Sequence, residues 1–297
     1  MSERVDLHLR TLFVETRPLG IDRLAVHAEL RDVRYIDLPG YLGVEHPKGV
    51  VHHMALDLEL DREFTIQAVE PWMGTVPFEP SPKTWGEGCR NVIPNYQQLV
   101  GIRLDAGYAA RVLESVGGRM GCFHILSLAQ CLPLAIRERN EEAFTEFRRQ
   151  LRIEATTDET LRLGMSGQLI DEPLGGEPYG AELTLRLQLP KFAILEASAR
   201  RNGARFAGRD QALDSARGLE GLTITKGFTA AALERVGGSP HLSALVIAMT
   251  PVIPQASGAL AGFLKLSPDQ KLRGRARNPQ ADSCHMWRGD GPLMSLR

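Results

Sequence analysis

Four side chains in the first half of the sequence have the types needed for metal binding or nucleophilic catalysis: His52, Cys89, Cys122 and His124. Two thiolates and two imidazoles suit tetrahedral Zn²⁺, and three such ligands with a water would form a catalytic zinc or iron site. Without a metal, Cys122 would be the nucleophile and His52 its base, because Cys122 and His124 point in different directions at a helix start. The set predicts catalytic residues His52, Cys122 and His124, and metal ligands Cys89, Cys122, His124 and His52.

Both cysteines lie where helices are expected to begin. Cys89 precedes Ile93-Pro94, and proline is favoured in the first turn of a helix. A thiol near a helix N-terminus has a lowered pKa, so more of it is the reactive thiolate. Cys122 and His124 form a Cys-x-His pair that opens the next helix. The 32 residues between the two cysteines do not make a compact zinc motif, so the spacing alone is a weak signal.

Each of these residues also has a structural interpretation. Cysteine is among the most buried residue types and often packs as a small hydrophobe. Cys131, inside an apolar helix, is assigned to the core. His124 and His241 are each expected to cap a helix if they have no other role. Cys284-His285 in the tail is interpreted as an exposed pair rather than as metal ligands.

The chain repeats itself with a period of about 120 residues. Nine of the 20 positions of segment 99–118 recur in segment 219–238, far more than unrelated segments share. The repeat predicts a tandem duplication of one domain. The second copy has fewer metal-binding or nucleophilic side chains. At the four candidate positions it has Tyr179 for His52, Arg209 for Cys89, Ser239 for Cys122 and His241 for His124. This asymmetry favours a site in the first copy.

Hydrophobic periodicity indicates the same elements in both copies. Apolar residues alternate with polar ones over 24–30, 56–60, 161–165 and 183–187, as in antiparallel strands with one buried face. Helical spacing follows at 108–116 and 228–236, and apolar helices at 124–136 and 241–249. We therefore predict an α+β fold in which each copy has an antiparallel sheet followed by helices on one face. The predicted boundaries are 5–140, 147–264 and a basic tail at 265–297, with a helical or solvated linker over 137–150.

Composition excludes several classes of protein. Lys and Arg total 35 and Asp and Glu 36, so there is no basic excess for general nucleic-acid binding. Four cysteines in 297 residues are too few for a disulfide scaffold. The charge-free stretch 241–264 is interpreted as a buried helix over 242–249 followed by a loop broken by proline, rather than as a membrane span. No signal peptide is visible, so a soluble cytoplasmic protein is expected. Nucleotide, hydrolase-elbow and zincin motifs are absent.

The run HHMALDLEL, followed by YQQLVGIRLDAGYAARVLESVGGRMGCFHILSL, resembles a bacterial family described only as a domain of unknown function. Members show His-x-Met before a strand, a Tyr-x-x-Leu-x-Gly helix end and a Gly-Gly…Gly-Cys-x-His-Leu motif. The resemblance covers roughly residues 5–138, and the matching positions are His52, Cys89, Cys122 and His124. Ile125 replaces the usual Leu, and an acidic residue usual after the motif is missing. The resemblance implies a setting in aromatic-acid or acyl-CoA catabolism.

A more distant similarity of element order links the first copy to NifU-type iron–sulfur scaffolds and their SufE relatives, without their diagnostic cysteine spacing. Three functions follow. The first is a small-molecule catabolic enzyme of lyase or hydrolase type, using Zn, Fe or no cofactor. The second is a non-catalytic iron–sulfur or sulfur carrier. The third is a structural or partner-binding protein whose cysteines belong to the core. The expected partners are a small-molecule substrate and a second copy of the chain, with neither nucleic acid nor membrane.

Overall fold

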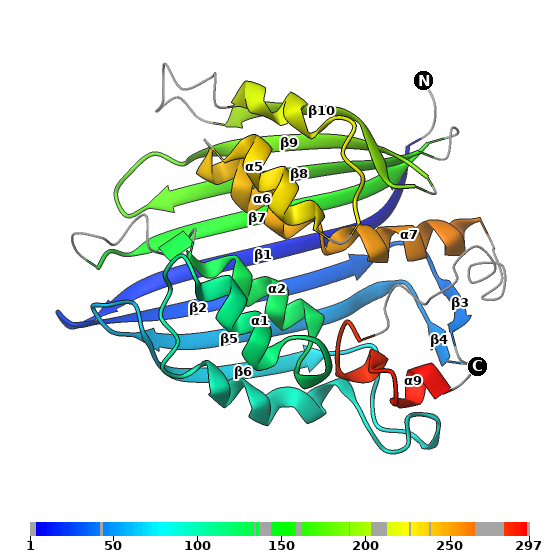
Figure 1. The fold of residues 1–297 in the computed structure, drawn as a ribbon, viewed down its shortest axis with the longest axis horizontal. Helices are drawn as coiled ribbons and strands as arrows, with labels where there is room; N and C mark the ends of the chain where they lie inside the picture. Colours follow the sequence, from blue (N-terminus) through cyan, green and yellow to red (C-terminus); the bar gives the residue numbers. More distant parts are fainter. Residues whose placement is uncertain are drawn as a thin grey trace.

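Eight strands of this computed structural model form the main antiparallel sheet, in the order β10-β9-β8-β7-β1-β2-β5-β6 (Figure 1). The structure describes residues 4–41, 44–133, 135–136, 144–158, 162–189, 191–202, 213–225, 227–237, 239–264 and 282–295. The strands are β1 (Val5–Leu19), β2 (Arg23–Arg34), β5 (Gly49–Leu60), β6 (Ile66–Thr75), β7 (Phe147–Thr157), β8 (Leu163–Pro173), β9 (Tyr179–Gln188) and β10 (Ala193–Asn202). A small second sheet pairs β3 (Leu38–Tyr41) with β4 (Val44–His46).

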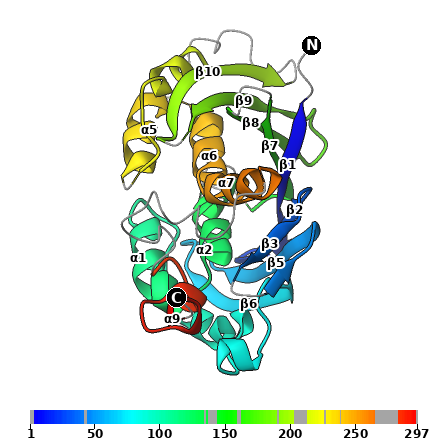
Figure 2. The ribbon, with the colours of Figure 1, turned by 90° about the vertical axis from the view of Figure 1, so that its right-hand side faces the viewer.

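The helices lie on one face of the main sheet, which curves around α2, α6 and α7 (Figure 2). Those of the first half are α1 (Tyr108–Val116) and α2 (Phe123–Gln130), with 3₁₀ segments η1 (Pro82–Thr84), η2 (Cys89–Leu99) and η3 (Gly118–Met120). Those of the second half are η4 (Ser215–Leu219), α5 (Phe228–Val236), α6 (Pro240–Met249) and α7 (Val252–Phe263). Near the C-terminus lie η5 (His285–Trp287) and α9 (Pro292–Ser295). The α+β class with helices packed on an antiparallel sheet is therefore confirmed.

Alternation of burial explains why the strands form where they do. Along β2 the buried residues are Leu24, Val26, Ala28 and Leu30, which face the helices, while the residues between them face away. This is the period of two expected of a sheet with one covered face. The same inward register continues to Asp32 and Arg34, so two charged residues at the end of β2 are also buried.

The two halves share one sheet and one core. β1 and β7 pair over most of their length at the centre of the sheet, and buried residues of both halves form one hydrophobic cluster. Four strands of each half run outward from this central pair in matching order. Two copies of a four-stranded unit would give this order, and the tandem duplication and the domain boundaries stay predictions.

Several helix ends follow local sequence. α1 ends at Val116, and Gly117 follows as its C-cap, as the double glycine predicts. α6 begins after Ser239, whose side chain accepts a hydrogen bond from the N–H of Leu242. Cys122 occupies the equivalent N-cap position of α2. The caps are therefore Cys122 and Ser239, so the expectation that His124 and His241 cap these helices is wrong.

Two local expectations are also wrong. Residues 252–263 form α7 instead of a broken loop, because Pro254 falls in the first turn, where its missing N–H costs no hydrogen bond. Residues 147–150 belong to β7 rather than to a linker, while 137–143 lie outside the described residues. A helix does follow the glycine before Cys89, but it is a 3₁₀ helix that begins at Cys89 itself, with Pro94 inside it rather than in its first turn. No single helix among the described residues is long and apolar enough to span a membrane; α6 and α7 meet the length and composition criteria only together, with a 43° bend between them.

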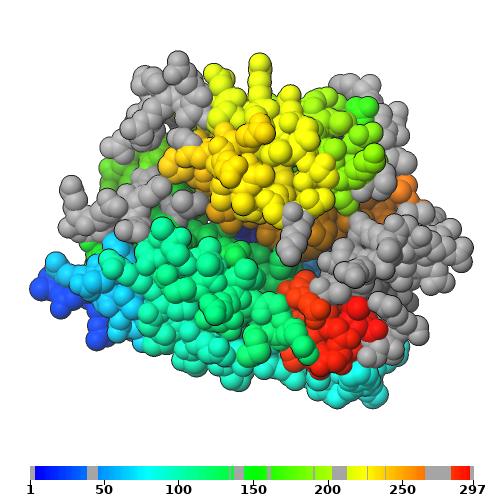
Figure 3. Space-filling view, viewed as in Figure 1, coloured from blue at the N-terminus to red at the C-terminus, as the bar shows by residue number. Residues whose placement is uncertain are grey.

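The last described segment, residues 282–295, packs against the first half. The His285 N–H donates to the Gly121 carbonyl at 2.9 Å, and Arg288 makes two hydrogen bonds of 2.6 Å with the Glu87 carboxylate. Met286 and Trp287 are buried beside Phe78. In Figure 3 this red segment lies directly against the teal surface of the first half. Cys284 is half-buried and His285 pairs with Glu87 at 3.1 Å, so the exposed pair expected at 284–285 is wrong. Residues 265–281 of the predicted tail lie outside the described residues.

Candidate functional site

Three charged or polar side chains form a row across three neighbouring strands. Arg10 of β1 is paired in register with Asp32 of β2, and Asp32 with His52 of β5. All three face the helices, since residues opposite one another on adjacent strands share a face. Arg10 grips the Asp32 carboxylate with two hydrogen bonds, Nε to Oδ1 at 2.7 Å and Nη2 to Oδ2 at 2.8 Å. His52 Nδ1 lies 2.9 Å from Asp32 Oδ2.

The next inward row extends the site toward the end of β2. His8 lies opposite Arg34 on the neighbouring strand, and its Nε2 is 3.2 Å from Asp32 Oδ1. Both are buried, His8 at 1 % and Arg34 at 9 % exposure. Burial lowers the pKa of Arg34 to about 10, with Asp32 acting in the opposite direction, so Arg34 stays charged at neutral pH.

Two helices complete the site from above the sheet. His124, in the first turn of α2, stacks on His52 with the ring centres 3.6 Å apart. Its Nε2 lies 3.7 Å from Asp32 Oδ2, and its side chain is 15 % exposed. Gln255, from α7 in the second half, can pair with all its polar neighbours when its amide takes one of its two orientations. In that orientation Oε1 accepts hydrogen bonds from Arg10 Nη2 at 2.8 Å and from His124 Nε2 at 2.6 Å. Its Nε2 donates to Asp32 Oδ2 at 3.2 Å. We call His8, Arg10, Asp32, Arg34, His52, His124 and Gln255 the Asp32 cluster.

Close packing of α7 holds Gln255 over the sheet. A Cβ at Gly262 would lie 2.7 Å from the carbonyl oxygen of Asp37, so only glycine allows α7 this close to the chain that leads into β3. α7 also contacts β1 and β7. The site in the first half is therefore completed by a residue of the second half.

The environment of the cluster keeps the Asp32 carboxyl ionised and the imidazoles of His52 and His124 uncharged. Burial by itself would raise the pKa of Asp32, but the Arg10 guanidinium and the hydrogen bonds from Arg10, His52 and His8 hold that pKa well below its usual range. Burial lowers the pKa of His52, although Asp32 opposes this, and burial lowers the pKa of His124 further with the help of His52. At neutral pH the site thus holds an ionised carboxylate beside two uncharged histidines.

The structure brings three of the four predicted residues together and leaves Cys89 out of contact with the histidines. Cys122 Sγ lies 3.8 Å from His124 Nδ1 and 3.9 Å from Met54 Sδ. Cys89 packs against the hydrophobic core and against the C-terminal segment. In the described part of the chain, the group of three or more ligand-type residues with ligand atoms within 4.8 Å of one another is Asp32, His52 and His124. A carboxylate therefore joins the two predicted histidines where sulfur was expected.

The expectation of lowered thiol pKa values is wrong. Burial raises the pKa of Cys89 well above its usual range, with Cys122 adding to the effect. Burial raises the pKa of Cys122 to about 12, although the nearby backbone N–H groups of Ile125 and His124 partly oppose it. Desolvation of the thiolate therefore outweighs the helix N-terminus. Cys131 is buried in the core as predicted, and burial raises its pKa to about 11.

The second half contains a reduced version of the same arrangement. Arg149 grips Asp171 with hydrogen bonds of 2.7 and 2.8 Å, and His241 Nε2 lies 3.1 Å from Asp171 Oδ2. Tyr179 pairs with Asp171 in register, at the place that His52 has beside Asp32. Phe147 and Pro173 form the next row, where the first half has His8 and Arg34. The Arg–Asp–His unit is thus common to both halves, and His8, Arg34 and His52 are special to the first.

Five members of the Asp32 cluster were not among the residues predicted from the sequence: His8, Arg10, Asp32, Arg34 and Gln255. Two signals were available for the strand residues. The inward alternation of β2 continues through Asp32 and Arg34, and Arg10 and Asp32 recur 139 residues later as Arg149 and Asp171. No local pattern marks Gln255, because its role depends on the docking of α7.

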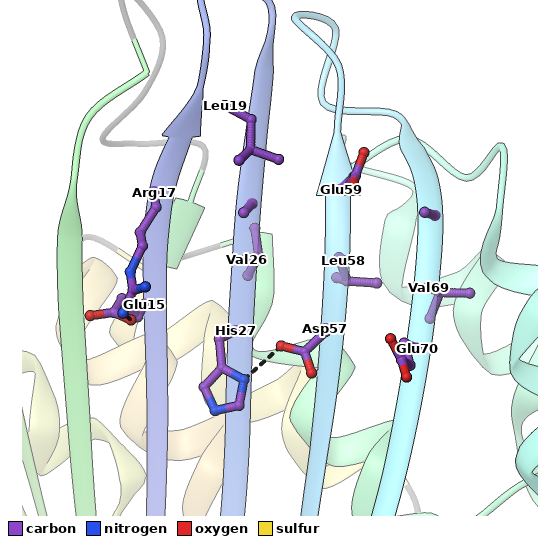
Figure 4. Close-up of a pocket in the computed structure, with 12 residues that line it drawn as sticks. Glu15, Arg17, Leu19, Val26, His27, Asp57, Leu58, Glu59, Val69 and Glu70 are labelled. Carbon is purple, nitrogen blue, oxygen red and sulfur yellow. Dashed lines mark hydrogen bonds and ion pairs between the residues drawn. The ribbon is translucent and has the colours of Figure 1, made fainter.

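A groove on the opposite face of the sheet is a weaker candidate (Figure 4). Glu15, His27, Asp57 and Glu59 are among its lining residues, and His27 Nδ1 lies 2.7 Å from Asp57 Oδ1. Glu15 is itself paired with Arg148 at 2.6 Å. These groups satisfy one another on an open surface, which is the usual state of a solvated sheet face.

Comparison with known proteins supports the resemblance of the first half to a family without an assigned function. No curated protein and no solved structure matches the chain significantly. Residues 8–138, which contain every member of the Asp32 cluster except Gln255, match the family described as "Protein of unknown function (DUF2889)".

Proposed function

We propose that this protein is an enzyme acting on a small molecule, with a metal-assisted site at the triplet Asp32, His52 and His124. The observation that carries the proposal is the convergence of three ligand atoms, one from each residue, within 4.8 Å of one another. Ligation needs a neutral imidazole and an ionised carboxylate, which are the protonation states that the site imposes. Asp32 and His52 are held by the sheet and His124 by α2. Such rigid support suits a site that must keep its geometry during a reaction.

The groups around the triplet suit this role. A metal-binding histidine usually donates its other ring N–H to an acceptor, which fixes the orientation of the ring. His52 Nδ1 and His124 Nε2 lie 2.9 and 3.7 Å from Asp32 Oδ2, so these three atoms would bind the ion, which would take the place of any proton on the two imidazole nitrogens. His124 Nδ1 faces Cys122 Sγ at 3.8 Å. Cys122 thus becomes a positioning residue for His124 in this proposal.

The ligand chemistry narrows the choice of ion. Two imidazoles and one carboxylate suit Zn²⁺ or Fe²⁺ and leave further positions for water and substrate. An ion there would polarise a carbonyl group or activate water, which fits the lyase or hydrolase chemistry expected from the sequence. Its setting in the catabolism of aromatic acids or acyl-CoA intermediates stays a prediction.

The alternatives have less support. A thiol nucleophile needs an accessible thiolate, whereas Cys122 is buried and burial raises its pKa to about 12. A sulfur or iron–sulfur carrier of the NifU and SufE kind needs exposed thiols of low pKa, and Cys89 has the opposite environment. A purely structural role explains the common Arg–Asp–His unit, but not the additional polar residues of the first half.

We also propose that the two halves descend from a tandem duplication, in which the second half serves as scaffold. Supporting observations are the matching strand order and the recurrence of a buried Arg–Asp pair with the same two hydrogen-bond lengths, 2.7 and 2.8 Å. Tyr179 in place of His52 removes one ligand from the second copy. The second half then contributes Gln255 to the site of the first.

The proposed metal site is tested by Co²⁺ titration of chelator-treated protein, followed by visible absorption and calorimetry. Wild-type protein should bind one equivalent. His124→Gln and His52→Gln should each weaken binding at least about 100-fold, because each removes a ligand. His241→Gln is the matched control: it changes the equivalent histidine beside Asp171 and should bind like the wild type. Failure of the wild type to bind Co²⁺, Zn²⁺ or Fe²⁺, or an equal loss in His241→Gln, contradicts the proposal.

A further inference from the structure

The Asp32 cluster carries more buried positive than negative charge. Arg10 and Arg34 contribute two positive charges and Asp32 one negative charge, which leaves one positive charge before the histidines are counted. The Asp32 carboxylate already accepts hydrogen bonds from Arg10 and His52. It therefore offers Arg34 a long-range interaction but no direct pairing. A buried charge without a direct partner is costly and is rare in proteins.

Three side chains of the cluster have buried hydrogen-bonding atoms without a partner. Within the described residues, Arg34 Nε, Arg34 Nη1 and His8 Nδ1 are buried and have no hydrogen-bond partner. Arg10 Nη1 is also without one, but so is its second-half counterpart Arg149 Nη1, so that feature belongs to the common structural unit. The unused donors of Arg34 have no such counterpart, because Pro173 occupies the equivalent position.

Two residues near Arg34 and the rest of the cluster are only partly buried. His46, at the end of β4, is half-buried, and its pKa is lowered first by burial and then by Arg34 and His52, which places it near both. His124 on the other side is 15 % exposed. Arg34 therefore has His8 opposite it on β1 and the half-buried His46 nearby.

We propose that Arg34, with His8 and His46 beside it, binds the carboxylate group of a small organic anion, and that this anion is the substrate. The identification as substrate rests on the proposed function, whereas anion binding does not. A carboxylate would balance the single excess charge and accept hydrogen bonds from the unused arginine N–H groups. The Asp32–His52–His124 triplet would then face the remainder of the molecule.

The inference is tested by thermal unfolding and calorimetry with acetate, butyrate, inorganic phosphate and chloride at one ionic strength. The carboxylates should stabilise the wild type in a saturable manner and bind at least about tenfold more tightly than chloride, as expected for charge-assisted hydrogen bonds. Arg34→Gln should abolish this response, and Arg34→Lys should retain part of it because the charge remains. Arg34→Gln should be no less stable than the wild type without ligand, because it removes an uncompensated charge.

The outcomes separate this inference from the metal proposal. Carboxylate binding that Arg34→Gln abolishes supports the inference, whether or not Co²⁺ binds to the triplet. Co²⁺ binding by a protein that responds equally to acetate and chloride overturns the anion site and leaves the metal site standing. A stronger response to phosphate than to acetate overturns carboxylate recognition. Loss of stability in ligand-free Arg34→Gln also contradicts the inference, because it would show that Arg34 already has a structural partner.

Discussion

Asp32 and Asp171 provide a matched pair of perturbations. Each carboxylate is completely buried and accepts two hydrogen bonds, of 2.7 and 2.8 Å, from one arginine, Arg10 or Arg149. Removing one partner of such a pair costs about 3–5 kcal/mol, since the other charge stays buried. Asp171→Asn leaves Arg149 uncompensated, whereas Asp32→Asn leaves both Arg10 and Arg34 in one site. We therefore expect Asp171→Asn to lower the free energy of unfolding by about 3 kcal/mol and Asp32→Asn by about 5 kcal/mol.

The assay is equilibrium unfolding in urea at pH 7.5, followed by circular dichroism and fluorescence. A double-mutant cycle isolates the contribution of Arg34: adding Arg34→Met to Asp32→Asn should restore about 1–2 kcal/mol, because one of the two uncompensated charges disappears. Adding Arg34→Met to Asp171→Asn should give no such rescue. If Asp32→Asn costs less than Asp171→Asn, or if Arg34→Met further destabilises Asp32→Asn, the charge accounting of the cluster is wrong.

Three further predictions concern pH, thiols and the C-terminal segment. Folding lowers the pKa of His52 and His124, so as the pH drops the unfolded chain takes up protons before the folded protein does. At pH values below about 6.5, the free energy of unfolding should therefore decrease by up to about 1.4 kcal/mol per pH unit for each histidine. Unfolding measured at pH 7.5 and 5.5 checks this, and an unchanged stability contradicts it. Cys89 and Cys122 should react with a thiol reagent only after denaturant is added, and rapid labelling of native protein would show that they are exposed. Glu87→Gln should weaken the packing of residues 282–295 on the first half by about 1 kcal/mol or less, because the ion pair of Glu87 with Arg288 is partly exposed. A red shift of Trp287 emission and faster proteolysis of the segment should report this change. An unchanged spectrum would show that apolar packing alone holds the segment.

Periodicity predicted elements well where one face is uniformly apolar. The strand over 24–30 and the helix over 108–116 follow this rule, and both are present. β1 and β7 were not predicted as strands, because their inward faces carry His8, Arg10 and Arg149 among apolar residues. A buried ion pair thus removes the alternation that identifies a strand. The fold tolerates these polar residues because each aspartate lies opposite its arginine in register.

The candidate site was only partly predictable for a related reason. His52, Cys122 and His124 have conspicuous residue types, and the structure brings them together. Asp32 resembles any polar residue at the end of a strand until the register places it opposite His52. Thiol pKa values were misjudged because the sequence indicates a helix start but not the depth of burial. The overlooked residues are those whose roles depend on distant parts of the chain.

The central pairing of β1 with β7 has a consequence for producing parts of the chain separately. A chain ending near residue 145 would lose the eleven-residue β7 and leave the inner edge of β1 without hydrogen bonds. It would also expose apolar residues now covered by α6 and α7, and it would lack Gln255. Such open strand edges promote aggregation. Recombinant expression of residues 8–138 alone should therefore yield insoluble protein, so biochemical work on this family segment requires the second half in the same chain.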